Sequence, residues 1–395
     1  MTAVPCAAFY TPLKHPSLEE PSGDREIARM LMAALAGCGL DPELASRLAS
    51  WRRRFDPTDA ARLERRAALV ADLLIRRYRR RAPLHRPRLW LTYQNYHRAP
   101  DFLGPPVASA LAIPYVIVDT AVSGKSRRGE FRPWASAARA AVRRADLIFA
   151  MSPRDLPALA RLRGPEFAAS RLLLLPPAVD LSRFDHATAN RGMEPVTDAP
   201  LLLCVAMMRH ADKLDSYRLL AAALAHLYAT RPGLGWQLVV AGDGPARGEV
   251  EAAFDGLPRE RVRFLGEISP ERLPRLYRAA EVLVFPGLGE ALGLVYVEAA
   301  AAGLPVVACH GPGQSVTVAP GGGLLTEPTA EAFAVAVSSL LDDPERRALM
   351  GAAARRFAAA HTREVFRRRL AEGLARLGGH AAVDAVGIPS GAEVP

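Results

Sequence analysis

The second half of this 395-residue chain repeats one pattern, in which a short apolar run precedes a longer segment of helical periodicity. Short unbroken apolar runs are typical of strands that are buried on both faces of a sheet. Because strands that alternate with helices pair in parallel through crossover connections, the pattern predicts a parallel, doubly wound α/β sheet. The predicted strands are residues 201–206, 236–241, 262–265, 282–285 and 305–308.

The first half shows the same alternation in a looser form, so a chain of this length predicts two domains. A polar, turn-prone stretch at 185–200 is the expected linker between them. We therefore expect an N-terminal domain at 1–190, a second at 191–361, a helix at 362–377 that packs back on the first domain, and a disordered tail at 378–395. The strands expected in the first domain are residues 3–10, 88–92, 114–118, 146–151 and 171–175.

Positive charge is concentrated in the first domain. Residues 1–190 contain 30 Lys and Arg against 18 Asp and Glu, whereas 191–395 contain 21 against 23. Arginines gather at 52–54, 65–66 and 76–81, interleaved with leucines at near-helical spacing, which indicates basic amphipathic helices. Three interpretations stay open: a solvated face, contact with an anionic membrane surface, or nucleic-acid binding.

Several classes of protein are disfavoured by what the sequence lacks. It has no run of eighteen apolar residues and no signal-peptide pattern at its start, so we expect a cytoplasmic protein. The four cysteines are scattered, with no Cys-x-x-Cys pair and no histidine pair at zinc spacing, so we expect them to be reduced, buried and structural. No metal site is predicted.

Two glutamates follow the predicted strand at 282–285. Glu290 lies in a glycine-rich turn, and Glu298 lies about two turns into an alanine-rich helical segment. Free amides at a helix start favour an anion, and glycines let the backbone approach it closely. Both carboxylates accept hydrogen bonds from sugar hydroxyls, so the motif suits a nucleotide sugar better than a bare phosphate.

Two further loops follow strands of the second domain. Arg209 and Lys213 come just after the strand at 201–206, where they can clamp a diphosphate. Gly242 and Gly244 form a tight turn after the strand at 236–241, which permits close approach of a ligand. Because the carboxyl ends of parallel strands meet at one edge of a sheet, these loops are expected to surround one site.

With these motifs in order, residues 200–345 resemble the retaining family-4 glycosyltransferases of the GT-B fold, as found in bacterial polysaccharide and lipid synthesis. The resemblance also includes VRFLGEIS at 262–269, GLPVVA at 303–308 and GGLL at 322–325. It implies two Rossmann-like domains that face each other across a cleft, with the acceptor on the N-terminal domain.

The resemblance also implies a role for each residue of the motifs. Arg209 and Lys213 would hold the diphosphate of the sugar donor, Glu290 would contact the sugar near its reacting carbon, and Glu298 would bind ribose hydroxyls. Backbone amides around Leu292, Gly293 and Leu294 would bind phosphates, and the segment with Gly266 and Glu267 would face the nucleobase. No cofactor or metal is implied, and the chain has no Asp-x-Asp.

The chain departs from the family pattern at three positions. Ser22-Gly23 stands where a Gly-Gly pair is usual, and Gly23 would still admit the phosphates. Asp119 follows the strand at 114–118 where a histidine is common, and it would act as a base or a sugar contact on the acceptor side. Ala291 replaces the glycine after the first motif glutamate.

The motifs and the family resemblance that they carry imply a metal-independent, retaining hexosyltransferase that uses a nucleoside-diphosphate sugar. Its acceptor would be lipid-linked or a polysaccharide, at the cytoplasmic face of a membrane, and nucleic acid would not be a partner. Two alternatives remain: a sugar-nucleotide epimerase of the same fold, or a basic protein without enzymatic activity that binds membranes or nucleic acid.

Overall fold

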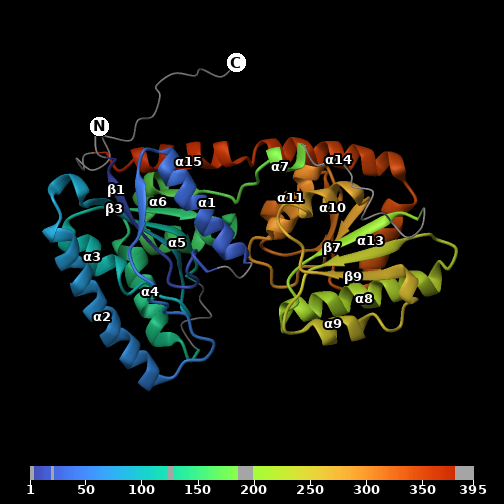
Figure 1. The fold of residues 1–395 in the computed structure, drawn as a ribbon, viewed down its shortest axis with the longest axis horizontal. Coiled ribbons are helices and arrows are strands. Elements are labelled where there is room, and N and C mark those ends of the chain that lie inside the picture. Colours follow the sequence, from blue (N-terminus) through green and yellow to red (C-terminus); the bar gives the residue numbers. More distant parts are fainter. Residues whose placement is uncertain (1–3, 19–21, 123–128, 186–198, 379–395) are drawn as a thin grey trace, which may run out of the picture. The chain divides into compact units, whose positions relative to one another are not determined.

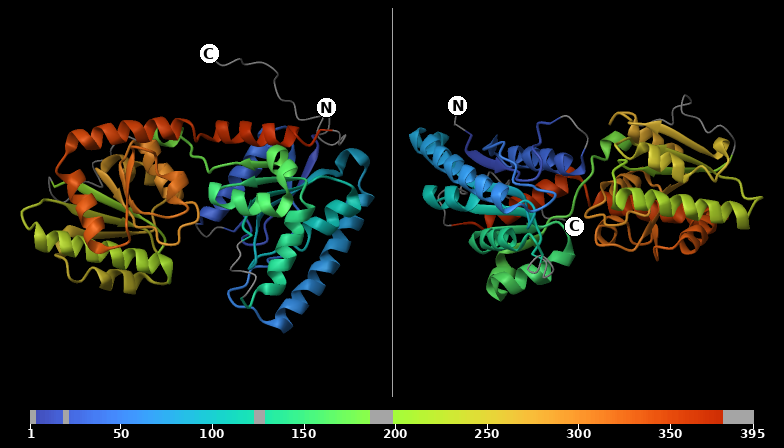
Figure 2. Two further views of the ribbon diagram at one scale, coloured as in Figure 1. Left: turned by 180° about the vertical axis from the view of Figure 1, so that it is seen from behind. Right: turned by 90° about the horizontal axis from the view of Figure 1, so that it is seen from below.

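The computed structural model describes residues 4–18, 22–122, 129–185 and 199–378, which form two compact units (Figures 1 and 2). The first unit runs to Pro176 and includes the chain from Arg363 onward, and the second unit runs from Pro177 to Thr362. Most of the predicted linker, and the predicted disordered tail except Gly378, lie outside the described residues.

The first unit is built on a six-stranded sheet in the order β2-β1-β3-β4-β5-β6, and every neighbouring pair is parallel. Crossovers therefore run in one direction from β1 to β2 and in the other from β3 onward, which places a switch point between β1 and β3. The strands are β1 (Cys6–Tyr10), β2 (Asp41–Leu44), β3 (Pro87–Asn95), β4 (Tyr115–Thr120), β5 (Leu147–Ala150) and β6 (Leu172–Leu174).

Helices cover this sheet on both faces. In Figure 1, α1 (Gly23–Gly37) and α15 (Arg363–Ala375) lie together on one side, and α2 (Pro57–Arg80), α3 (Gly104–Leu111) and α4 (Arg132–Arg144) lie on the other. The shorter helices α5 (Leu156–Arg163) and α6 (Pro165–Arg171) precede β6. The arginines at 52–54 lie before α2 and are not helical, because Asp56 caps the helix and Pro57 begins it.

The second unit has its own parallel sheet in the order β12-β11-β10-β7-β8-β9, with a switch point between β7 and β10. All five strands predicted for this unit are present, and β12 adds a sixth at one edge. Together with the sheet of the first unit, this confirms two Rossmann-like, doubly wound sheets. The strands are β7 (Leu201–Val205), β8 (Gln237–Ala241), β9 (Val262–Gly266), β10 (Val282–Val284), β11 (Val306–Cys309) and β12 (Gly323–Thr326).

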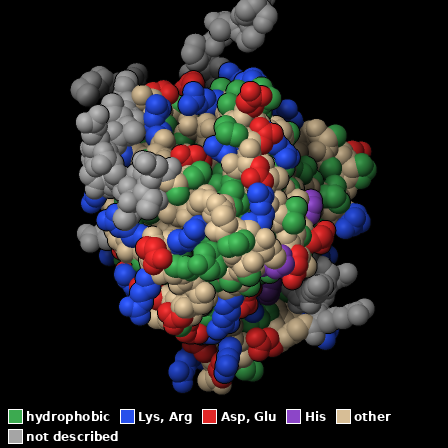
Figure 3. Space-filling model, turned by 90° about the vertical axis from the view of Figure 1, so that its right-hand side faces the viewer, with side chains coloured by type: hydrophobic (Ala, Val, Ile, Leu, Met, Phe, Trp, Pro, Cys, Tyr) green, Lys and Arg blue, Asp and Glu red, His purple; other side chains and the backbone are tan. Residues whose placement is uncertain are grey.

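The helices of the second unit also form two layers. In Figure 1, α8 (Asp212–Thr230), α9 (Arg247–Ala253) and α13 (Ala330–Leu341) lie on one side of the sheet. The other side carries α7 (Ser182–Asp185), α10 (Leu273–Ala279), α11 (Leu294–Ala302) and α14 (Pro344–Ala359), and the short α12 (Gln314–Thr317) precedes β12. The face in Figure 3 carries side chains of both charges, interspersed with apolar ones.

The central strands of each sheet are buried between its helical layers, and the edge strands are more exposed. In the second unit β7, β8, β10 and β11 are buried along their whole length, as their apolar sequences predict. The four cysteines are buried and none forms a disulfide. Among the described residues no helix is long and apolar enough to cross a membrane.

Candidate functional site

The switch point of the second unit brings two distant segments together. Lys213 lies in the first turn of α8, and its ammonium group forms an ion pair with the carboxylate of Glu290, in the loop after β10. The same nitrogen lies 4.8 Å from the centre of the Phe285 ring, within range of a cation–π contact. Both charged side chains are largely buried, with 29% and 19% of their surfaces exposed. Two residues predicted to share a site therefore touch.

The loop that carries Glu290 is held by a set of buried polar contacts. The side-chain amide of Gln314 donates a hydrogen bond to the carbonyl oxygen of Gly287 at 2.7 Å. The hydroxyl oxygen of Ser216, on α8, accepts one from the N–H of Leu288 at 2.9 Å. Gln314 and Ser216 are fully buried, so these contacts fix the loop in a dry environment where an unmade hydrogen bond would be costly.

Glycines shape this loop for a steric reason. Gly289 has a φ of 67°, and a side chain there would overlap the carboxylate of Asp212 at the start of α8. Gly293 also has a φ of 67°, where a Cβ would overlap the Tyr296 ring. The loop after β10 therefore favours glycine at both positions, through its positive φ values and its close approach to α8 and α11.

Helix α11 starts immediately after the loop. Gly293 is its N-terminal cap and offers no side chain, and the N–H groups of Leu292, Gly293 and Leu294 have no hydrogen-bond partner in the described part of the chain. Unpaired amides and the helix dipole at this position favour an anion, and Lys213 provides a cation nearby through its pair with Glu290.

Glu298 lies in the second turn of α11. The hydroxyl group of Tyr277, on α10, donates a hydrogen bond of 2.8 Å to its carboxylate. Burial, with the nearby negative charge of Glu298, holds the pKa of Tyr277 well above its usual value, so the tyrosine remains a hydrogen-bond donor. One oxygen of Glu298 is thus oriented by the protein.

The loops after β7 and β8 are packed against each other. The N–H of Met208 donates a hydrogen bond to the carbonyl of Asp243 at 2.9 Å. A Cβ at Gly242 or Gly244 would overlap the carbonyl oxygens of Ala206 and Met208 respectively. The packing of the neighbouring loop is therefore itself a reason for glycine at these two positions, and the approach of a ligand to them stays a prediction.

Arg209, in the loop after β7, and Gly266, the last residue of β9, lie at the carboxyl ends of their strands. The side chain of Arg209 is partly exposed and forms no ion pair with any described residue, so it remains available to an anion. Gly266 accepts a hydrogen bond of 2.8 Å from the N–H of Gly242 through its carbonyl, and Glu267 is exposed beside it.

The switch point of the first unit carries a second polar cluster. Gln94 and Asp119 lie near the ends of the adjacent strands β3 and β4, with φ values of 69° and 62°, which are unusual for residues other than glycine. The amide of Gln94 donates to the carboxylate of Asp24, at 2.9 Å, and Asp24 also forms an ion pair with Lys14. Gly23 is the first residue of α1, directly beside Asp24.

Asp119 is the most perturbed acid of this cluster. Burial, together with the negative charges of Asp155 and Asp24, raises the pKa of its carboxyl group to about 7, while a hydrogen bond from Gln94 acts in the opposite direction. A carboxyl group with such a pKa can take up or release a proton near neutral pH, as a general base requires.

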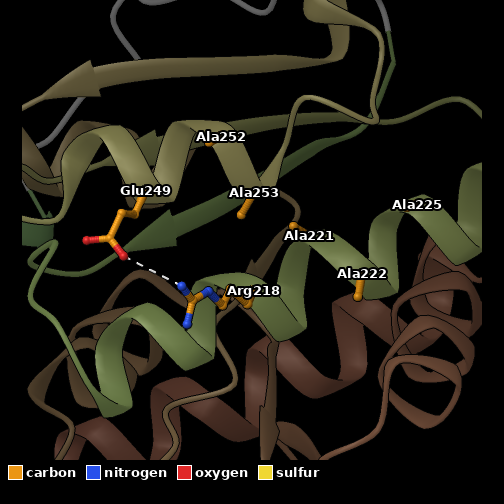
Figure 4. Close-up of a pocket in the computed structure, with 7 residues that line it drawn as sticks. All are labelled: Arg218, Ala221, Ala222, Ala225, Glu249, Ala252 and Ala253. Carbon is orange, nitrogen blue, oxygen red and sulfur yellow. Dashed lines mark ion pairs between the residues drawn. The ribbon is translucent and has the colours of Figure 1, made fainter.

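Some contacts of the site were not predicted from the sequence. Gln314, Ser216, Tyr277 and Gln94 lack any motif signal, because each acts through a partner that is far away in the chain. A hollow of about 460 Å³ lies between α8 and α9. Figure 4 shows the residues that line it, which are five alanines and the ion pair of Arg218 with Glu249. It contains none of the predicted site residues. No cluster of metal-ligating side chains occurs in the described ranges.

Comparison with known protein families gives a match in the second unit. Residues 199–343 match the family model described as "Glycosyl transferases group 1". The match includes Arg209, Lys213, Glu290 and Glu298.

Among sequence relatives, the chain is similar to D-inositol 3-phosphate glycosyltransferase 2 of Catenulispora acidiphila, at 34% identity over 52% of this chain and 50% of the relative. It is also similar to a GDP-mannose-dependent monoacylated phosphatidylinositol monomannoside mannosyltransferase of Corynebacterium glutamicum, at 34% identity over 46% and 50%. These matches span about half the length of each relative.

Among solved structures, the chain resembles a sucrose-phosphate synthase from Thermosynechococcus elongatus, with a TM-score of 0.71 and 22% identity over 94% of this chain and 99% of that one. It also resembles Anabaena Alr3699/HepE in complex with UDP-glucose, with a TM-score of 0.68 and 18% identity over 93% and 99%. At these identities the likeness shows a common fold.

Proposed function

The chain carries a group 1 glycosyltransferase domain at residues 199–343 within a GT-B fold, and from this premise we propose that it transfers a hexose from a nucleoside-diphosphate sugar to an acceptor hydroxyl. The contact between Lys213 and Glu290 at the switch point of the second unit carries the proposal. It joins a cation suited to a diphosphate and a carboxylate suited to a sugar, beside the free amides that begin α11.

The sugar donor is assigned to the second unit. The diphosphate binds the N–H groups of Leu292, Gly293 and Leu294, with Lys213 and Arg209 as cations. Glu298, held by Tyr277, accepts hydrogen bonds from the ribose hydroxyls. The relatives support a nucleotide-sugar donor, since one is named as GDP-mannose-dependent and one structural neighbour was solved with UDP-glucose.

The reaction retains the configuration of the transferred sugar. Departure of the nucleoside diphosphate develops negative charge on its phosphate oxygens, and Lys213, Arg209 and the start of α11 stabilise that charge. Because protein cations and amides supply this stabilisation, no metal is required. Glu290 contacts the sugar, whose developing positive charge its carboxylate stabilises, and the acceptor attacks from the face that the leaving group vacates.

The acceptor is assigned to the first unit, where Asp24 and Asp119 offer carboxyl groups at the switch point. Asp119 takes the proton of the attacking hydroxyl, because its pKa of about 7 allows proton exchange near neutrality. The relatives are named for inositol phosphate and phosphatidylinositol mannoside acceptors, which favours a polyol acceptor, lipid-linked or within a polysaccharide.

The decisive experiment measures thermal unfolding with a panel of UDP-, GDP-, ADP- and dTDP-linked hexoses. A ligand at 100 times its dissociation constant should add roughly 2.7 kcal/mol to the stability of the folded state. We expect one nucleotide sugar to raise the melting temperature, and Lys213→Ala to reduce the shift. The control Arg218→Ala removes an exposed cation further along α8, outside the predicted site, and should keep the full shift. Equal shifts in both variants, or no shift with any donor, would contradict the proposal.

A further inference from the structure

Helix α2 has one face in the core and one face in solvent. Its buried positions pack against the first unit and include Leu63, Leu74 and Tyr78. On the opposite face Leu69 and Leu73 expose 66% and 64% of their surfaces. Residues four apart lie one above the other on a helix, so these two leucines form a single outward apolar strip.

Arginines surround this strip along the helix axis. Arg65 and Arg66 lie one turn before Leu69, and Arg76 and Arg80 lie one and two turns after Leu73. All four are exposed, and none forms an ion pair or hydrogen bond with another described residue. We call these four arginines with Leu69 and Leu73 the outward face of α2.

Other arginines near the end of α2 have structural partners. Arg77 and Arg81 bind the carboxylate of Glu43, at 2.5 Å in each case, and Arg79 donates to the carbonyl of Ala110 at 2.8 Å. The arginine cluster at 76–81 therefore divides into residues that stabilise the first unit and residues directed to solvent. This division could not be made from the sequence.

We propose that the outward face of α2 binds the surface of an anionic lipid bilayer. The four arginines lie at the level of the lipid phosphates, and Leu69 and Leu73 enter the boundary between headgroups and acyl chains. Charge complementarity favours an anionic partner, and the leucines at the centre of the arginines favour lipid over nucleic acid, since phosphates and sugars offer leucine no apolar contact. The proposal does not depend on catalysis.

The test is co-sedimentation of the full chain with vesicles of phosphatidylcholine alone or mixed with phosphatidylglycerol. We expect binding to the mixed vesicles only, and weaker binding as salt rises and the Debye length falls from about 10 to 3 Å. Removing the four charges as Arg65→Gln, Arg66→Gln, Arg76→Gln and Arg80→Gln should weaken binding by tenfold or more, given the contribution of each basic residue. The double variant Leu69→Ser, Leu73→Ser keeps every charge and should also weaken it.

Matched controls separate this face from net charge and general apolarity. Leu349→Ser removes a leucine of α14 that is 73% exposed, and should bind like the unmodified chain. A second control removes four positive charges elsewhere, as Arg259→Gln, Arg346→Gln, Arg356→Gln and Arg368→Gln. It should also bind vesicles like the unmodified chain.

Three outcomes would overturn the proposal. These are equal binding to neutral and anionic vesicles, equal losses in the outward-face and control variants, or binding that depends on the arginines but not on the leucines. The last outcome, with tight binding to RNA in the same buffers, would identify nucleic acid as the partner. Because no sugar donor is present, failure here leaves the proposed transfer untouched.

Discussion

At the scale of single residues, Glu290 and Glu298 are held in different ways, so their substitutions should have different effects. Glu290 pairs with Lys213 beside the predicted diphosphate site, and Glu298 accepts a hydrogen bond from Tyr277 further along α11. We expect Glu290→Gln to fold normally and lower kcat by about 100-fold or more. Glu298→Ala should mainly raise the dissociation constant of the sugar donor. Steady-state kinetics measure the loss of turnover, and thermal shifts measure the loss of donor binding. Normal turnover in Glu290→Gln would contradict a catalytic role for Glu290.

The cations of the second unit give a prediction about metals. If Arg209 and Lys213 neutralise the leaving diphosphate, Arg209→Ala and Lys213→Ala should each weaken nucleoside-diphosphate binding by roughly tenfold or more. Chelators should leave turnover unchanged. Binding is measured by calorimetry, and turnover with and without EDTA. Activity abolished by EDTA and restored by magnesium or manganese would refute the metal-free mechanism.

Asp119 should make stability depend on pH. Its pKa is raised to about 7 in the folded chain, so between about pH 4 and pH 7 the folded state binds a proton that the unfolded state has released. Stability should therefore fall as pH rises through this window. Asp119→Asn keeps a residue that tolerates the φ of 62° and should flatten the fall. Calorimetric melting from pH 4.5 to 8 tests this; parallel profiles for both proteins would contradict it.

The sequence could supply the candidate residues of the site but not their contacts. Order and spacing along the chain pointed to Lys213 and Glu290, yet nothing in them predicts the pairing of two residues 77 positions apart. Gln314 holds the Glu290 loop by donating to backbone carbonyls, and any polar side chain at that position would look the same in the sequence.

At the scale of elements, the strands that were predicted best are the ones buried on both faces. The two strands that were not predicted, β2 and β12, are edge strands and lack an unbroken run of apolar residues. Strand β2 is Asp-Pro-Glu-Leu, with two acids and a proline, and pairs only with β1. An edge strand needs one set of backbone partners and leaves its other side in solvent, so its sequence carries little apolar signal.

The contact between the loops after β7 and β8 can be tested through its glycines. Gly242 and Gly244 have φ values of 147° and 153°, and a side chain at either position would overlap a backbone carbonyl. Gly242→Ala or Gly244→Ala should cost about 1–3 kcal/mol and displace the loop that carries Arg209.

The control is a glycine four residues after Gly244, in the same unit. Gly248 is in α9 with nothing within 4 Å of its would-be Cβ, so Gly248→Ala should be neutral or stabilise by about 0.4–1 kcal/mol. Chemical denaturation compares the three variants. Equal stability in all of them would mean that the loop contact is dispensable.

At the scale of the whole molecule, the chain crosses from one unit to the other twice. Helix α15 follows the second unit in sequence but packs on α1 of the first. The carbonyl of Arg367 accepts a weak hydrogen bond from the Cys38 thiol at 3.8 Å, and a Cβ at Gly373 would overlap the Phe149 ring. The stability of the first unit therefore depends on residues at the far end of the sequence.

This connectivity predicts a selective effect on unfolding. Phe366 is 2% exposed on the inner side of α15, and Phe366→Ala should destabilise the first unit by about 3–5 kcal/mol. In calorimetry we expect the melting temperature of the first unit to fall. The second unit, identified as the one whose melting temperature rises when a nucleoside diphosphate binds, should melt at an unchanged temperature. Phe333→Ala, at a fully buried position of α13 in the second unit, should do the reverse. A shift of the ligand-sensitive transition by Phe366→Ala would show that α15 stabilises the second unit instead.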